Sequence, residues 1–325
     1  MNARPAEFML PANTPFDLTG TVRLDCAATV SDAVARLLIE RFPDAESDLP
    51  FLKKAFDDVE AAFWGDFSGY LSCDTPYHDL RHALDTALLT ARMVDGYQSI
   101  HARTVSALSG TEAVLAVFLA LAHDTGFLRR IDEAHLCGAQ LSQEHEARSV
   151  DFVRAYLAGG PLADFGDSAE LIHVTCFAQA TADVLHGHRE QQAAIARMIG
   201  SADLISQVSD RCYLERCRDY LYHEIRVAGM DRTRDAAGQE CIRYLDGIDL
   251  LAKTPGFYDG LVRRRLEDDF GNIQHVLGRH FGEVNPYADS IRANLDYLRR
   301  LIGENRLGDG LRRHPAPLLP AVKKT

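Results

Sequence analysis

The sequence predicts an all-α fold, and two patterns indicate it. Apolar side chains recur at helical spacing in segment after segment, and Ser, Asp, Gly or Pro stands where these segments begin or end. No stretch of useful length alternates apolar and polar residues as a half-buried strand does. There is also no internal repeat and no shift in composition. We therefore expect one domain over residues 26–305, after an irregular segment 1–25 and before a disordered, proline-containing tail 306–325.

Two helices are expected near the start of the chain, one on each side of Pro43. Ser31 can cap the first, and the second covers residues 50–64 and ends before Gly65. Their apolar positions show the helical period: Ala33, Val34, Leu37 and Leu38 in the first, then Phe51, Leu52, Ala55, Phe56, Val59, Phe63 and Trp64 in the second.

A histidine-containing stretch, residues 75–82, is expected to start the third helix. Asp74 or Thr75 can cap this helix, and Pro76 suits its first position, where no backbone donor is needed. At about 3.6 residues per turn, His78 and His82 would then lie one turn apart on the same face.

A second chemical motif ends the most apolar segment, residues 113–122. His123 and Asp124 follow it directly, and Gly126 can terminate the helix. A helix this apolar is buried, and burying an ionisable pair at its end is costly unless an opposite charge compensates. A divalent metal ion would compensate.

The rest of the chain is expected to be helical as well. Helices are predicted over residues 144–157, 168–182, 190–210 and 212–227, and then to about residue 303 with breaks at 254–256 and 285–286. Residues 96–111, 126–143 and 229–239 are expected to be connectors.

Composition limits the partners and the compartment. The chain has 325 residues, 46% of them hydrophobic, and can bury a full core. Its formal net charge of −12 disfavours nucleic acid or an anionic membrane as partner, although a bound dication would still admit a phosphorylated small molecule. No apolar run is long enough to span a membrane, and no secretory signal stands at the start. Seven scattered cysteines without a Cys-x-x-Cys pair indicate reduced thiols in a cytoplasmic protein.

Two histidines one turn apart, a His-Asp pair and a later aspartate make a mixed nitrogen and oxygen ligand set. Such a set suits Zn, Mn, Fe or Mg, with positions left for water and substrate. Either motif alone also fits a solvated helix face. Together, and in this order, they predict one or two divalent metal ions whose identity stays open.

These motifs resemble the HD-domain superfamily of metal-dependent phosphohydrolases, and within it the branch related to the cyclic-nucleotide phosphodiesterases. That branch carries Tyr-His-Asn-x-x-His, which stands here as Tyr77 to His82 with Asp79 in place of the usual Asn. The His-Asp signature is His123-Asp124, and the downstream aspartate matches Asp203 in its Ala-Asp-Leu context. The resemblance covers residues 70–210 and implies an HD-domain-like helical bundle, completed by the helices of residues 211–305.

By position, the resemblance implies metal ligands at His82, His123, Asp124 and Asp203, with Asp124 bridging to a second ion. His78 would be the catalytic general acid that protonates the leaving alkoxide, a role for which the ordinary pKa of histidine is suited. Other implied contacts are a hydrogen bond from Asp85 to a ligand histidine, and His145 or Glu146 near the second metal.

Several of these assignments have alternatives. His145 and Glu146 equally fit the charged face of an amphipathic helix. His173 could be a further ligand, but Phe177 stands where relatives of this branch often carry histidine. The remaining candidates are Asp183 or Asp210 in place of Asp203, His186 and His188 as a surface turn, and Gln274 as a purine-selecting amide.

The expected activity is that of a metal-dependent phosphohydrolase. The His78 motif favours a phosphodiesterase that cleaves a nucleotide-type diester with metal-activated water. The first alternative is a nucleoside monophosphate phosphatase or a guanosine polyphosphate hydrolase. A di-iron oxygenase, which needs His145 and His173 as ligands, and a non-catalytic nucleotide sensor are further alternatives.

Overall fold

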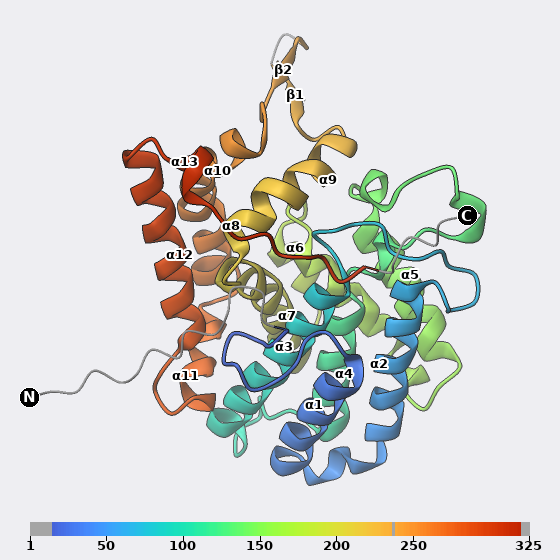
Figure 1. Ribbon diagram of the computed structural model, residues 1–325. Coiled ribbons are helices and arrows are strands. Elements are labelled where there is room, and N and C mark those ends of the chain that lie inside the picture. Colours follow the sequence, from blue (N-terminus) through green and yellow to red (C-terminus); the bar gives the residue numbers. More distant parts are fainter. Residues whose placement is uncertain (1–14, 236–237, 320–325) are drawn as a thin grey trace, which may run out of the picture.

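The computed structural model describes residues 15–235 and 238–319, and it confirms the all-α prediction (Figure 1). The helices are α1 (Ala27–Arg41), α2 (Leu49–Trp64), α3 (Leu80–His101), α4 (Gly110–Ala122), α5 (His145–Ala158), α6 (Thr181–Leu185), α7 (Glu190–Ser209), α8 (Tyr213–Arg216), α9 (Tyr222–Val227), α10 (Gly247–Phe257), α11 (Val276–His280), α12 (Pro286–Gly303) and α13 (Leu307–Gly310). Strands β1 (Arg232–Arg234) and β2 (Glu240–Ile242) form a small antiparallel hairpin.

Three helices, α3, α4 and α7, form the centre of the molecule (Figure 1). Every residue of α4 from Glu112 to Ala122 is buried, and the helix packs against both α3 and α7. The surrounding helices cover the outer sides of this centre: α1 and α11 pack on α3, α2 packs on α4, and α12 packs on α7. The central position of α4 agrees with its apolar sequence.

Capping interactions explain where the central helices begin. Ser109 and Glu112 form a capping box at the start of α4, in which each side chain accepts a hydrogen bond from the other residue's backbone N–H. At the start of α3, the Asp79 carboxylate accepts from the backbone N–H of His82 at 3.2 Å. The helix therefore starts at Leu80, and not near Pro76 as expected.

The run from α8 to α9 is continuous, because a π-helical turn at Cys217–Leu221 joins the two helices. Further π-helical turns follow α10, at Tyr258–Val262 and Arg265–Asp269. The rest of the non-α helical structure is 3₁₀, at Pro43–Ser47, Thr125–Phe127, Ile131–Glu133, Gly138–Leu141, Ala163–Thr175 and Ile273–His275.

The structure differs from the expectations at several places. Ser31 lies buried within α1 and does not cap it, since that helix starts at Ala27. The helix expected over residues 168–182 is a 3₁₀ helix followed by the short α6, and the expected connector 229–239 contains β1, which pairs with β2 just after it.

The structure also differs from the disordered tail that was expected after residue 305, as far as residue 319, where the described residues end. Residues 307–310 form α13, Leu311 is buried, and the backbone N–H of Leu318 donates to Asp79 Oδ2 at 2.7 Å. Residues 1–14 and 320–325 of the two expected terminal segments lie outside the described residues. Within the described residues, no helix combines the length and the apolar character that crossing a membrane requires.

Candidate metal centre

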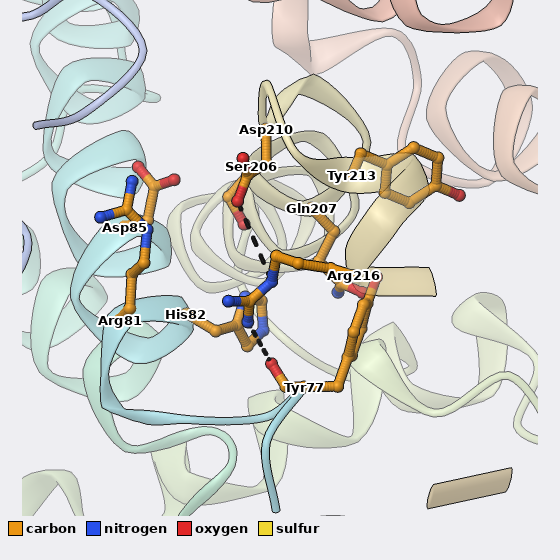
Figure 2. Close-up of a pocket in the computed structure, with 9 residues that line it drawn as sticks. All are labelled: Tyr77, Arg81, His82, Asp85, Ser206, Gln207, Asp210, Tyr213 and Arg216. Atoms are coloured by element: carbon orange, nitrogen blue, oxygen red, sulfur yellow. Dashed lines mark hydrogen bonds and ion pairs between the residues drawn. The ribbon is translucent and has the colours of Figure 1, made fainter. Parts of the chain in front are cut away.

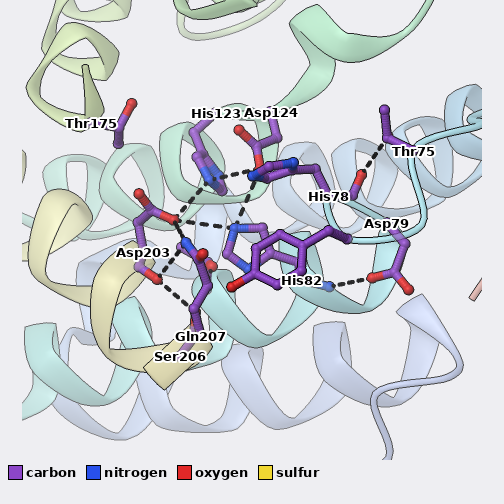
Figure 3. A network of polar contacts seen from close by, with 12 residues as sticks. Thr75, His78, Asp79, His82, His123, Asp124, Thr175, Asp203, Ser206 and Gln207 are labelled. Atoms are coloured by element: carbon purple, nitrogen blue, oxygen red, sulfur yellow. Dashed lines mark hydrogen bonds and ion pairs between the residues drawn. The ribbon is translucent and has the colours of Figure 1, made fainter. Parts of the chain in front are cut away.

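Helices α3, α4 and α7 bring four of the expected site residues together (Figure 3). His82 lies in the first turn of α3, His123 and Asp124 follow α4, and Asp203 lies in the middle of α7. His82 Nε2 lies 3.3 Å from Asp124 Oδ2 and 3.2 Å from Asp203 Oδ1. His123 Nε2 lies 3.2 Å and 3.5 Å from the same two oxygens. One atom each of His82, His123 and Asp203 lie within 4.8 Å of one another, which is compatible with a shared metal ion.

Three of the facing atoms of this cluster have no hydrogen-bond partner among the described residues. His82 Nε2, His123 Nε2 and Asp124 Oδ2 are buried, and none is hydrogen-bonded within the described part of the chain. His123 Nδ1 lies 2.8 Å from the carbonyl oxygen of Ala120, to which it donates. In a neutral ring this leaves the lone pair on Nε2, the atom that faces the carboxylates. The ring is therefore oriented and polarised as a metal ligand is.

The electrostatics also fit a site for a cation. Burial lowers the pKa of His82, but Asp124 and Asp203 raise it more, to about 9. Burial lowers the pKa of His123 as well, but Asp124 and Asp203 together outweigh it and raise the pKa well above its usual value. The two carboxylates respond in the opposite direction: burial raises their pKa values, yet the neighbouring histidines hold both below the usual range. The cluster thus favours positive charge between its carboxylates.

Asp203 and Asp124 are each held by further residues. Gln207, one turn further along α7, donates from Nε2 to Asp203 Oδ1 at 2.6 Å. On the other side, His145 Nε2 lies 3.7 Å from Asp124 Oδ1, while His145 Nδ1 donates to the carbonyl oxygen of Ser142 at 2.8 Å. Glu146 is buried beside His145. His145 and Glu146 line a cavity that Asp124 and Asp203 also line, so neither belongs to a purely solvated helix face.

Gly126 allows α5 to approach the His-Asp pair. A Cβ atom at this position would lie 1.8 Å from the carbonyl oxygen of His145. The residue does not end α4 as a left-handed cap, because it lies within the 3₁₀ turn Thr125–Phe127. Its role is to permit a close backbone contact.

His78 lies near His82, but it does not share a helix with it. It precedes α3 in a turn, in which the Thr75 hydroxyl donates to the carbonyl oxygen of His78 at 3.0 Å. The two imidazole rings are 6.0 Å apart, and the Phe127 ring stacks on His78 at 4.5 Å. Phe127 also stacks on His145 at 4.3 Å, so one buried ring fixes two imidazoles.

Glu224 is the residue of the site that the sequence did not suggest. Its buried carboxylate accepts from the backbone N–H of Tyr77 at 2.6 Å and lies 2.6 Å from His78 Nδ1. Burial lowers the pKa of His78, but Glu224 outweighs it and raises the pKa above the usual value. Glu224 lies in α9, 146 positions after His78, and a glutamate in a helical run carries no local signal for this role.

Asp79 is paired with a buried arginine. Arg216 Nη2 donates to Asp79 Oδ1 at 3.2 Å and to the carbonyl oxygen of Tyr77 at 2.8 Å. The guanidinium also lies 5.6 Å from the centre of the Tyr77 ring. A charged Asp79 therefore has a buried counter-ion while it caps α3.

The expected hydrogen bond from a ligand histidine to the Asp85 carboxylate does not form. Asp85 Oδ1 has no hydrogen-bond partner among the described residues, and burial raises the pKa of Asp85 to about 7. Figure 2 shows Asp85 beside Arg81, lining a small polar cavity behind His82. Its volume of about 20 Å³ is large enough for a water molecule.

The other candidate site residues do not belong to the candidate metal cluster of His82, His123, Asp124 and Asp203. Asp210 accepts from the backbone N–H of Cys212, and His173 pairs with Glu170 at 3.4 Å. Gln274 lines a different cavity, between α12 and the π-helical turns, so it cannot select a base at this site. Asp183 lies in α6 and His186 directly follows it, and both side chains are exposed. His188 is half-buried in the turn before α7.

A large cavity of about 580 Å³ opens from the cluster. Asp124, Asp203, His78 and Glu224 are among the residues that line it. Its size is in the range of sites for small organic ligands.

All seven cysteines are outside disulfides, and only Cys176 and Cys217 lie on the cavity wall.

Comparison of the chain with family models, with curated proteins and with solved structures finds no match.

Proposed function

We propose that the chain is a metal-dependent phosphodiesterase of the HD-domain type. One observation carries the proposal: three buried atoms that find no hydrogen-bond partner in the described part of the chain, His82 Nε2, His123 Nε2 and Asp124 Oδ2, converge together with the Asp203 carboxylate. Buried polar atoms are rarely left without partners, so a convergent group of nitrogen and carboxylate atoms is suited to binding a cation. Nitrogen and carboxylate donors of this kind fit Zn, Mn, Fe or Mg.

In this proposal His82, His123, Asp124 and Asp203 hold the metal. When bound, a divalent cation supplies Lewis acidity toward the phosphoryl oxygens and generates a hydroxide-like nucleophile near neutral pH. The cavity beside the carboxylates gives the phosphodiester access to this end of the site. The orientation of two of these ligands is set by the chain itself, through Ala120 for His123 and Gln207 for Asp203.

His78 acts in this scheme as the general acid. Because Nδ1 is engaged by Glu224, the proton for transfer is carried on Nε2. As the water oxygen bonds to phosphorus and the bond from phosphorus to the leaving oxygen breaks, His78 Nε2–H gives its proton to that oxygen. Glu224 stabilises the protonated imidazole beforehand, which keeps the acid form available near neutral pH.

The first test is hydrolysis by metal-stripped protein resupplied with manganese, magnesium, zinc or iron(II). We expect cleavage of bis-p-nitrophenyl phosphate that depends on metal and is lost in His123→Ala and Asp124→Ala. His186→Ala is the matched control, because it removes an exposed histidine outside the site.

Each other outcome contradicts part of the proposal. Cleavage of p-nitrophenyl phosphate alone would indicate the monophosphatase. Unchanged activity in both variants would exclude the assigned ligands. The absence of hydrolysis with all four metals would exclude the proposed phosphohydrolase activity. The oxygenase alternative has no support from His173, which pairs with Glu170 instead of the metal cluster.

A further inference from the structure

The lining of the cavity is uneven in polarity. His78, Asp124 and Asp203 line it at the candidate metal centre, whereas most of the remaining lining is apolar and forms an apolar wall, with Arg243, Tyr244 and Lys253 among the polar residues that interrupt it. This wall comes from α7, α9, α10 and the adjoining π-helical turns, and its residues include Leu204, Val208, Leu221, Ile225, Leu250 and Val262. A ligand that fills the cavity therefore meets charge at the candidate metal centre and mostly hydrocarbon elsewhere.

Several polar side chains on the cavity wall have their donors already engaged. The Thr254 hydroxyl donates to the carbonyl oxygen of Leu250 at 3.0 Å, and that of Thr175 donates to Ile172 at 2.9 Å. The Ser142 hydroxyl donates to Ala139, and the Gln207 amide donates to Asp203. Arg243 and Lys253 also line the cavity, but Lys253 Nζ donates to the carbonyl oxygen of Arg243 at 2.7 Å and to Asp249 at 2.8 Å, and both cations lie over the Tyr244 ring. A nucleobase would lose hydrogen bonds to water on entering and would find few replacements from these engaged groups, which is costly.

The mouth of the cavity continues the apolar wall to the surface. Phe177, Met230 and Phe257 line the cavity, yet they are 49%, 37% and 36% exposed. The rings of Phe177 and Phe257 meet edge to face at 5.9 Å. Exposed apolar groups at a cavity mouth are typical of binding sites for apolar ligands.

We propose that the site takes an amphiphilic phosphoester, whose phosphoryl group lies at the metal cluster and whose long alkyl or isoprenoid chain lies along the apolar wall. The substrate class then differs from the nucleotide that the sequence suggested. This inference rests on the proposed function for the identity of the polar end, whereas the apolar end follows from the cavity alone.

The test measures binding, so that it stands apart from catalysis. Methyl-, butyl- and octylphosphonate, below their micelle concentrations, and adenosine monophosphate are titrated calorimetrically into manganese-loaded and metal-free protein. We expect Kd to fall roughly fourfold for each methylene that the wall covers. We also expect adenosine monophosphate to bind more weakly than octylphosphonate.

Two variants locate the effect on the wall. Leu221 and Ile225 line the cavity and are only half-buried, so Leu221→Gln and Ile225→Gln are compatible with folding. Each is expected to reduce the octyl-to-methyl affinity ratio about tenfold, because the chain then contacts an amide. Val105→Gln, at a residue 94% exposed and outside the cavity, should leave the ratio unchanged.

The outcomes separate this inference from the proposed function. Equal affinity for methyl- and octylphosphonate would overturn it, and so would a chain-length effect that persists in both glutamine variants. Tighter binding of adenosine monophosphate would return the substrate to the nucleotides. A chain-length effect in a protein that hydrolyses no phosphodiester would support the inference while removing the proposed function.

Discussion

Two side chains, Glu224 and Phe127, determine how His78 is presented to the cavity. Glu224 binds the backbone of the His78 turn and its imidazole Nδ1, and Phe127 covers one face of the ring. A histidine in a turn needs such support, because it lacks the backbone constraints of a helix. Glu224 therefore acts as a positioning residue for the proposed acid.

Replacing Glu224 by glutamine tests this role. Glu224→Gln retains a side-chain oxygen that can accept from the backbone N–H of Tyr77, but it removes the charge that stabilises protonated His78. We expect a rate loss that grows as the leaving group becomes more basic, and a similar but larger pattern in His78→Ala, about 10²- to 10⁴-fold for simple alkoxides. The measurement is kcat/KM for a series of diesters that differ in leaving-group pKa.

Glu215→Gln is the control for Glu224→Gln, since Glu215 is also buried in the same helical run but lies outside the cavity wall. The same loss for every leaving group would contradict the proton-transfer role and would indicate a structural effect of Glu224.

At the scale of elements, the segment after the His-Asp pair is held by α5. Arg148 of α5 donates from Nε to the carbonyl oxygen of Gly126 at 2.8 Å and from Nη2 to that of Leu128 at 3.1 Å. The same guanidinium binds both oxygens of Glu133, at 2.8 and 2.7 Å. This bidentate pair closes the segment onto α5, and it therefore supports the position of Asp124.

The Glu133–Arg148 pair predicts a specific pH dependence of stability. Arg148 lowers the pKa of Glu133 to about 2, below the value near 4.3 of an unfolded glutamate. The folded state thus gains stability from ionised Glu133 above about pH 4.5. This gain is lost as the pH falls from there toward 2. Urea unfolding should show a difference in stability between wild type and Glu133→Gln that is constant at pH 6 to 7 and shrinks toward pH 3.

The control is Glu283→Gln, which breaks an exposed pair with Arg279 and should change stability little at any pH. A difference between wild type and Glu133→Gln that stays the same from pH 7 to 3 would contradict the role of this ion pair.

Sequence patterns predicted some elements well and others poorly, for physical reasons. The helices of His82, His123 and Asp203 were predictable, because helical period and capping are local properties. The turn of His78 was not, since Pro76 and Asp79 both satisfy helix-start rules and Glu224 holds the turn from far along the chain. Over Ala163–Thr175 the apolar period did not distinguish a 3₁₀ helix from an α-helix.

On the scale of the whole molecule, the candidate metal centre joins the three central helices. His82, His123 and Asp203 come from α3, α4 and α7, which pack on one another to form the centre of the bundle. Sequence patterns indicated these residues as candidate ligands, because metal-binding residue types are recognisable locally. It did not reveal the apolar cavity wall, whose residues follow Asp203 in α7 or come from the helices after it.

Because the ligands come from separate helices, metal binding should stabilise the fold as a whole. The unfolded chain does not hold these residues together, so a metal at 100 times its Kd adds about 2.7 kcal/mol to the free energy of unfolding. For a chain of this size this corresponds to a rise in Tm of several degrees. Calorimetry of metal-stripped protein with and without manganese, zinc, iron(II) or magnesium measures this rise.

The same experiment on His123→Ala separates binding at the cluster from binding elsewhere. Without His123 the rise should vanish, whereas His186→Ala, which removes an exposed histidine, should retain it. A rise that persists in His123→Ala would locate the metal at another site. No rise with any of the four metals would mean that the converging buried atoms do not bind a cation, and the helices would then hold two carboxylates together through protonated histidines alone.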